Sequence, residues 1–183
     1  MRLFLAIDLP TASKKKLAEQ LEKLMNDYTN FTWVPPENYH ITLYFFGEIS
    51  NVEKIKKKVE EAIFDVESFR LYSIGADLFI KNKILLYIYF KREKKAEALE
   101  SKIKNIFQIK DKKKFIPHLT IGRYKVPSKQ QYINLKKKLN QLTITIDFPV
   151  NNVYLFQSNL SQGKPIYKKI TTFRLLNATS LSK

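Results

Sequence analysis

The sequence has 183 residues, of which 44% are hydrophobic and 13% aromatic, a composition typical of a folded globular protein and unlike that of a disordered one. It contains no cysteine, which excludes disulfide bonds and thiolate zinc sites. Thirty-three Lys and Arg residues against 17 Asp and Glu residues give a net charge of +16, which favours a polyanionic partner such as nucleic acid.

The apolar stretches of the sequence are short. None approaches the roughly 18 residues that a membrane span needs, and the apolar stretch before Asp8 is too short for a signal peptide. We therefore expect a cytoplasmic protein that does not associate with membranes. The chain has only four glycines and no G-x-G-x-x-G or Walker loop, so the common nucleotide-binding loops are absent.

Strand and helix signals alternate along the chain. Short segments rich in branched and aromatic residues predict strands at 2–8, 38–46, 69–80, 84–90, 116–124, 142–148, 152–158 and 166–174. Apolar residues at intervals of three and four predict helices at 10–28, from 51, at 91–107 and from 128. The expected N-caps, whose side chains can accept a hydrogen bond from the first helical turn, are Thr11, Asn51 and Ser128.

The order of these elements repeats. Residues 1–80 contain the order strand, helix, strand, helix, strand, and the same order recurs in 84–148. No Pro-, Gly- or Ser-rich linker separates the two parts. We interpret 1–183 as a single bilobal domain, with lobes at about 1–80 and 84–174 that can exchange strands. The predicted fold class is α+β, with an antiparallel sheet in each lobe and helices on its outer face.

The two histidines of the chain occur in the same tetrapeptide pattern. His40–Leu43 (HITL) and His118–Ile121 (HLTI) both consist of histidine, an aliphatic residue, threonine and an aliphatic residue. Side chains alternate between the two faces of a strand, so each histidine shares a face with its threonine, and the aliphatic residues share the other. Two such strands would line a cleft with two imidazoles and two hydroxyls.

This set of side chains suits phosphoryl chemistry. Near neutral pH one imidazole can be neutral and take a proton from water, while the other is protonated and gives a proton to the leaving oxygen. The hydroxyls of Thr42 and Thr120 can donate hydrogen bonds to the non-bridging phosphate oxygens. No further histidine and no carboxylate cluster accompanies the pair, so we predict no metal site and no cofactor.

Each of these patterns also has a plainer explanation. A strand histidine is often a half-buried residue, and threonine is a common strand former. Two histidines could also hold a metal, and the lysine triplets fit solvated helix faces at 14–16, 56–58, 112–114 and 136–138. The matched positions of the two motifs in the repeated parts favour a catalytic pair over these explanations.

In this context the sequence resembles the 2H phosphoesterases, and within them the bacterial and archaeal RNA 2′,3′-cyclic phosphodiesterases, also described as 2′-5′ RNA ligases. The resemblance extends over nearly the whole chain. It is carried by residues 1–10 (MRLFLAIDLP), by 33–34 and 38–48 around the first histidine, by 115–123 (FIPHLTIGR) and by 155–167 in the closing strands.

The resemblance implies a bilobal α+β fold with a pseudo-two-fold axis, in which both motifs face a central basic cleft. It implies metal-independent hydrolysis of a 2′,3′-cyclic phosphate at an RNA end to a 2′-phosphate. His40 would be the proton donor to the leaving 3′-oxygen, and His118 the proton acceptor from water. The reverse reaction would join a 5′-hydroxyl to the cyclic phosphate through a 2′,5′ linkage. The expected partner is RNA with such ends, transfer RNA among the candidates, and the protein is expected to be a monomer.

Further residues are candidates for contacts with the substrate. The family often has an arginine at the position of Arg123, although strict alternation points this side chain away from the cleft unless Gly122 permits a bulge. Tyr44 and Tyr124 share the cleft face by alternation, where they could stack on a base or pack between the lobes. Additional candidates are Arg2, Phe4 and Ser158.

Two other functions remain open from the sequence. The same chemistry could act on a small cyclic phosphate or a 2′-5′ oligoadenylate, in which case binding would depend little on salt. The chain could also be a non-catalytic RNA-binding module, although intact motifs in both parts argue against this.

Overall fold

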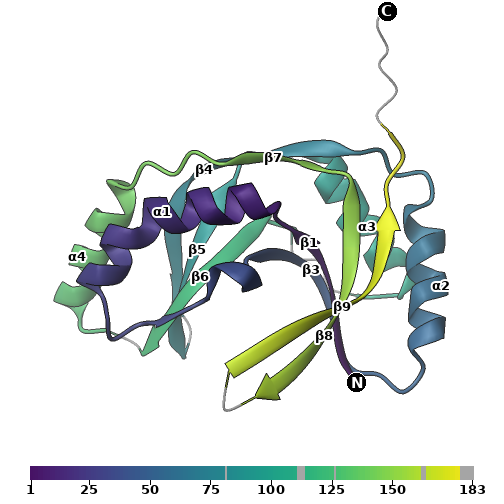
Figure 1. The fold of residues 1–183 in the computed structure, drawn as a ribbon, viewed down its shortest axis with the longest axis horizontal. Coiled ribbons are helices and arrows are strands. Elements are labelled where there is room, and N and C mark those ends of the chain that lie inside the picture. The colour runs from purple at the N-terminus through teal and green to yellow at the C-terminus, as the bar shows by residue number, and fades with distance from the viewer. Residues whose placement is uncertain (81, 111–113, 126, 162–163, 178–183) are drawn as a thin grey trace, which may run out of the picture.

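The computed structural model describes residues 1–80, 82–110, 114–125, 127–161 and 164–177 (Figure 1). Residues 112 and 113 of the third lysine triplet lie outside these ranges. The fold is α+β, as predicted. The strands in the described ranges are β1 (Arg2–Asp8), β2 (Thr32–Trp33), β3 (His40–Glu48), β4 (Phe69–Ile80), β5 (Lys83–Phe90), β6 (His118–Lys125), β7 (Asp147–Val150), β8 (Asn152–Ser161) and β9 (Lys164–Arg174).

The strand order gives the sheet an internal symmetry. The order is β7-β4-β5-β6-β3-β1-β8-β9, with β2 paired to β6. β3 and β6 meet at the centre through the antiparallel pair of Ile41 and Leu119, so that β1, β8 and β9 on one side correspond to β5, β4 and β7 on the other. β4 pairs with β5 and β7, whereas β8 pairs with β1. The two sides of the sheet are thus built by exchanging strands and do not follow a division at residues 80–84.

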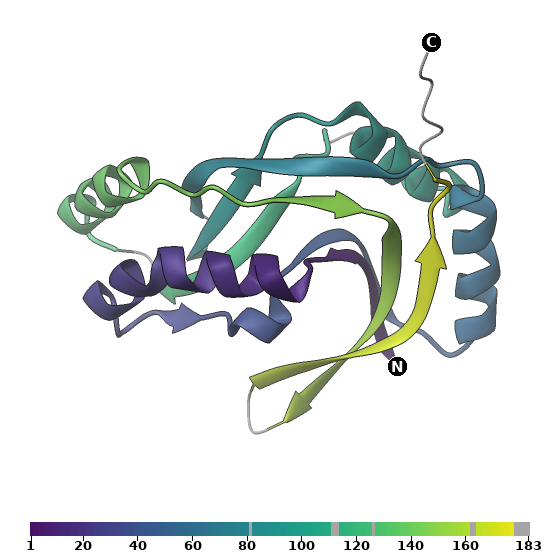
Figure 2. The same ribbon diagram turned by 45° about the horizontal axis from the view of Figure 1, so that its top comes forward.

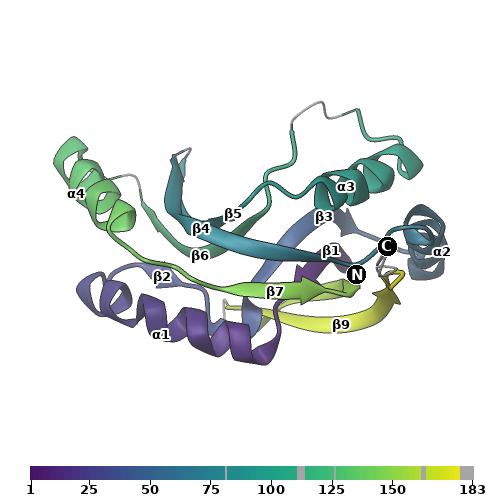
Figure 3. The same cartoon turned by 90° about the horizontal axis from the view of Figure 1, so that it is seen from above.

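The helices of the described residues form two pairs, which Figures 1 and 3 show toward opposite ends of the molecule. α2 packs against α3, and an ion pair between Asp27 and Lys138 links α1 to α4. None of these helices is long and apolar enough to cross a bilayer. Their bounds, with that of the short 3-10 helix η1, are α1 (Thr11–Asp27), η1 (Pro36–Asn38), α2 (Val52–Ile63), α3 (Lys94–Ile106) and α4 (Lys129–Asn140).

Two of the three expected helix caps are confirmed. The side chain of Asn51 accepts a hydrogen bond from the Lys54 amide at 2.9 Å, and Ser128 forms a capping box with Gln131. The expected Thr11 cap is wrong. Thr11 is already the first residue of α1, and Pro10 occupies the N-cap position without a side-chain hydrogen bond.

The strand expected at 142–148 begins later, at Asp147. The hydroxyl of Ser73 donates to the Ile144 carbonyl at 3.0 Å and accepts from the Ile146 amide at 2.9 Å. The Ser73 hydroxyl thus takes the place of the backbone groups of β4 that would bond this carbonyl and this amide in a regular antiparallel pair. The segment before Asp147 therefore runs beside β4 and buries Ile144 and Ile146 without forming a strand.

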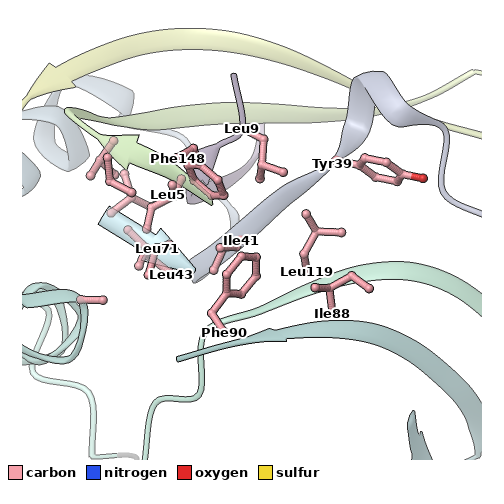
Figure 4. Close-up of a cluster of buried hydrophobic side chains, with 14 of the residues drawn as sticks. Leu5, Leu9, Tyr39, Ile41, Leu43, Leu71, Ile88, Phe90, Leu119 and Phe148 are labelled. Atoms are coloured by element: carbon pink, nitrogen blue, oxygen red, sulfur yellow. The ribbon is translucent and has the colours of Figure 1, made fainter. Parts of the chain in front are cut away.

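All four helices contribute to one hydrophobic core on one face of the sheet. Alternate residues of the central strands point into it, as Figure 4 shows for Ile41 of β3, Ile88 of β5 and Leu119 of β6. Burial of this apolar surface is the main force that holds strands and helices together. The opposite face, called the open face below, carries a separate cluster of Phe4, Ala6 and Phe156. Figure 2 shows how the sheet curls, with β8 and β9 forming a long curved hairpin.

Candidate active site

The two histidine motifs lie side by side on the two central strands. Ile41 is paired with Leu119. Because the two strands are antiparallel, His40 lies across from Thr120, and Thr42 lies across from His118. The aliphatic residues of both motifs are buried in the main core. The imidazoles and hydroxyls therefore share the open face, as the sequence predicts.

Each imidazole is oriented by a backbone carbonyl two residues earlier in the chain. Nδ1 of His40 lies 2.7 Å from the carbonyl oxygen of Asn38, and Nδ1 of His118 lies 2.8 Å from that of Ile116. A carbonyl oxygen only accepts, so Nδ1 carries the proton and donates in both rings. In the neutral rings Nε2 is then the unprotonated nitrogen. The Nε2 atom of His40 lies 3.1 Å from Oγ1 of Thr42, whose hydroxyl can donate to it.

His40 is enclosed by aromatic side chains of β1, β8 and β9. The centroid of its ring lies 5.0 Å from that of Phe4, 6.3 Å from that of Phe156 and 5.2 Å from that of Tyr167, which it meets edge-on. Burial lowers the pKa of His40 below its usual value, because it disfavours the charged ring. His118 has a different set of neighbours, Phe79 and Tyr87, and its ring lies nearer the solvent.

A group of charged residues surrounds His40 at the end of β1. Asp8, whose side chain is 11% exposed, is the cross-strand partner of His40 and pairs with Lys14 and Lys169, each at 2.6 Å. Lys14 also donates to the Glu37 carbonyl at 2.7 Å, which ties α1 to η1 just before His40. The Asn38 carbonyl and the Asp8 charge raise the pKa of His40, whereas the charges of Lys14 and Arg123 add to the lowering by burial. No sequence pattern marks Asp8, Lys14 or Lys169 as part of the site.

Both central strands contain a bulge at the last residue of their motif. In β3, Thr42 pairs with Ala6 and Tyr44 with Leu5, which leaves Leu43 as an extra residue. In β6, Thr120 pairs with Tyr87 and Gly122 with Leu86, which leaves Ile121 as the extra residue. An extra residue shifts the alternation of the side chains that follow it, up to the next irregularity of the strand.

In each strand the bulge turns the second residue after it toward the open face. In β6 this residue is Arg123, whose charge acts on His40. In β3 the equivalent residue is Phe45, which is 64% exposed and contacts Phe4 at 5.6 Å between ring centroids. The bulge at Gly122 that the sequence allows is therefore present. Phe45 was not predicted, because strict alternation assigned it to the core.

The predicted placement of Tyr44 and Tyr124 on the histidine face is wrong, because the same bulges turn both rings toward the main core. Tyr44 contacts Phe46 at 5.1 Å between centroids. Tyr124 stacks on Phe31 at 4.4 Å with an interplanar angle of 3°, and its hydroxyl accepts from Asn30 at 3.1 Å. The remaining candidates have different positions: Phe4 contacts His40, Arg2 is exposed at the start of β1, and Ser158 lies on β8 opposite Tyr167.

Among the described residues, no group of three or more His, Cys, Asp or Glu side chains is arranged to hold a metal ion. The groups that the site does supply are two oriented imidazoles, two threonine hydroxyls and a guanidinium. This set can donate and accept protons and can hold an anion.

Comparisons with known proteins agree with this arrangement. The family model described as the 2′-5′ RNA ligase superfamily matches residues 10–162. A protein of Thermotoga maritima named RNA 2′,3′-cyclic phosphodiesterase is 32% identical over 181 residues, which cover 92% of each chain. A protein of Methanocaldococcus jannaschii with the same name is 30% identical over 190 residues, covering 93% of this chain and 98% of its own.

Solved structures support the fold. A crystal structure of a protein from Thermus thermophilus has a TM-score of 0.74 and 23% identity, and the match covers 97% of this chain and 100% of that one. The apo structure of E. coli LigT has a TM-score of 0.71 and 21% identity, covering 96% of this chain and 97% of its own.

Proposed function

The chain belongs to the 2′-5′ RNA ligase superfamily, and from this premise we propose that it hydrolyses 2′,3′-cyclic phosphates at RNA ends to 2′-phosphates. The observation that carries the proposal is the pair of imidazoles on one face of the sheet, each oriented by a backbone carbonyl. Proton transfer at two oxygens of one phosphate needs two such groups on opposite sides of the phosphorus.

In the proposed reaction a water molecule attacks the phosphorus of the cyclic phosphate. Nε2 of His118 accepts a proton from the water as the new P–O bond forms. The bond between phosphorus and the 3′-oxygen breaks, and Nε2 of His40 gives its proton to that oxygen. Hydroxyl groups of Thr42 and Thr120 and the guanidinium of Arg123 hold the non-bridging oxygens, on which negative charge lies.

The lowered pKa of His40 is compatible with its role as the proton donor. The free site favours the neutral ring, since burial disfavours its charged form. A bound cyclic phosphate brings a negative charge close to Nε2, which favours the protonated form. Substrate binding and protonation of His40 therefore support each other.

The same groups serve the reverse reaction. A 5′-hydroxyl of a second RNA then takes the place of water, and the product carries a 2′,5′ linkage and a free 3′-hydroxyl. RNA is favoured over a small cyclic phosphate as the substrate, because the net charge of +16 attracts a polyanion more strongly than a single phosphate.

Alanine variants of the two histidines test the proposal. His40→Ala and His118→Ala are each expected to reduce turnover of a cyclic-phosphate RNA by about 10²- to 10⁴-fold, the usual contribution of a general acid or base. Thermal unfolding by circular dichroism checks that both variants are folded. Thr172→Ala, which changes an exposed threonine of β9, is the control. Full turnover in either folded histidine variant would overturn the assignment.

A further inference from the structure

Phe79 of β4 and Tyr87 of β5 form an aromatic platform beside His118. Their rings are stacked, with centroids 4.1 Å apart and an interplanar angle of 12°. Each ring also meets His118 edge-on with 5.7 Å between centroids. Tyr87 is 8% exposed, whereas Phe79 is 39% exposed and covers it. One side of the Phe79 ring is thus occupied by Tyr87, and much of the rest of the ring is open to solvent.

We propose that this platform binds the nucleobase of the RNA strand whose 5′-hydroxyl attacks the cyclic phosphate. The inference rests on the proposed function, in particular on His118 as the proton acceptor and on the ligation direction. A nucleobase has a flat π-face that stacks on an exposed aromatic ring whatever its identity, so the platform accepts any base.

The position of the platform indicates that it binds the attacking strand and not the strand that carries the cyclic phosphate. The leaving 3′-oxygen belongs to the cyclic-phosphate nucleoside, so that nucleoside lies on the side of His40. Attacking and leaving oxygens are in line on opposite sides of the phosphorus. The attacking nucleoside therefore lies on the side of His118, which is the histidine that Phe79 and Tyr87 contact.

Positively charged residues lie beside the platform on β5 and on its neighbour β6. Arg123 is opposite Leu85, and Lys125 is opposite Lys83 at the ends of β6 and β5. Residues 123 and 125 share one face of β6 after the bulge, which is the open face. Lys83 and Lys125 can therefore contact the phosphates of a strand whose first base lies on Phe79, while Arg123 holds the reacting phosphate.

The ligation step balances without a further reactant. A bond forms between the 5′-oxygen and phosphorus, and the bond between phosphorus and the 3′-oxygen breaks. The proton of the 5′-hydroxyl goes to Nε2 of His118, and the proton of Nε2 of His40 goes to the 3′-oxygen. The platform holds the base so that the 5′-hydroxyl competes with water for the same phosphorus.

The test measures hydrolysis and ligation in one reaction. An RNA ending in a 2′,3′-cyclic phosphate is incubated with an excess of a second RNA that has a 5′-hydroxyl, and both products are quantified. Phe79→Ala is expected to reduce ligation about 5- to 140-fold more than hydrolysis, the range expected for one stacked base. Phe79→Leu, which keeps apolar bulk but loses the ring, is expected to behave like Phe79→Ala, and Phe79→Trp like the wild type.

Phe64→Ala is the matched control, since Phe64 is an equally large aromatic residue, 72% exposed, at the end of α2. It is expected to keep both activities. An unchanged ratio of ligation to hydrolysis in Phe79→Ala, or an equal loss of both, would overturn the inference. A wild type that hydrolyses the ring but neither ligates nor cleaves a 2′,5′-linked dinucleotide would overturn it and leave the proposed function standing. A wild type that opens no ring would contradict the proposed function itself.

Discussion

At the scale of single residues, the two histidines share a backbone hydrogen bond but differ in their surroundings. His40 is expected to titrate below its usual pKa of 6.5, because burial disfavours the imidazolium. NMR titration of His118→Ala, in which His40 is the one remaining histidine, measures this pKa directly. Asp8→Asn in the same background is expected to lower the pKa of His40 further, since the Asp8 carboxylate favours protonation.

The same shift has consequences for activity and stability. As the proposed acid, His40 must be protonated, so kcat/KM is expected to decline as pH rises through the lowered pKa of His40, on the acid side of pH 6.5. His40 also contributes to the free energy of unfolding, and this contribution is present above pH 6.5 and is lost as the pH falls through the lowered pKa of His40.

Asp147→Asn, which removes a carboxylate paired with Arg70, is the control for Asp8→Asn in the NMR titration. A His40 pKa of 6.5 or above would contradict this account.

At the scale of elements, the bulges at the ends of the two motifs determine which side chains reach the open face. A Cβ atom at Gly122 would lie 2.9 Å from Cε3 of Trp33, so Gly122→Ala must displace either the indole or the β6 bulge. We expect this variant to lose about 1–3 kcal/mol of unfolding free energy, as overpacked sites do, together with part of its activity through Arg123.

Urea denaturation followed by circular dichroism measures this loss. Trp33→Leu removes the ring that the new methyl group would meet, so Gly122→Ala combined with Trp33→Leu is expected to lose less than the sum of the single variants. If the losses of unfolding free energy in the two single variants were additive, the contact with Trp33 would not be the cause of the destabilisation by Gly122→Ala.

The bulges also mark the limit of what the sequence can predict. The placement of the histidines and their threonines on one face, and the caps at Asn51 and Ser128, were predicted correctly because each depends on a local pattern with a fixed period. A bulge shifts that period by one residue. The sequence indicates such a shift only in β6, through Gly122, and gives no sign of the bulge in β3. Tyr44 was therefore assigned to the wrong face, as was Tyr124. Contacts such as those of Asp8 with Lys169 join β1 to β9, and no local pattern predicts a pair so distant in sequence.

At the scale of the whole molecule, the charge surplus is the strongest indication of an extended substrate. The 33 Lys and Arg residues exceed the 17 Asp and Glu residues by 33 − 17 = 16, so the chain carries a large net positive charge that attracts a polyanion. We expect KM for an oligonucleotide with a cyclic-phosphate end to rise steeply with salt, because bound phosphates release counterions.

A mononucleoside 2′,3′-cyclic phosphate provides the comparison, since it offers a single phosphate. Its KM is expected to change much less between low and physiological salt. Equal salt dependence of the two substrates would contradict an RNA substrate and favour the small cyclic phosphate.

In the proposed reaction a 2′,3′-cyclic phosphate is opened by two histidines, of which His118 accepts a proton from water and His40 gives a proton to the 3′-oxygen. The most direct measurement incubates the protein, with a chelator present, with a short RNA that ends in such a phosphate, and identifies the product isomer. The account predicts a 2′-phosphate as the sole product, because His40 protonates the 3′-oxygen. An unopened ring with the folded protein, or a product with a 3′-phosphate, would contradict it.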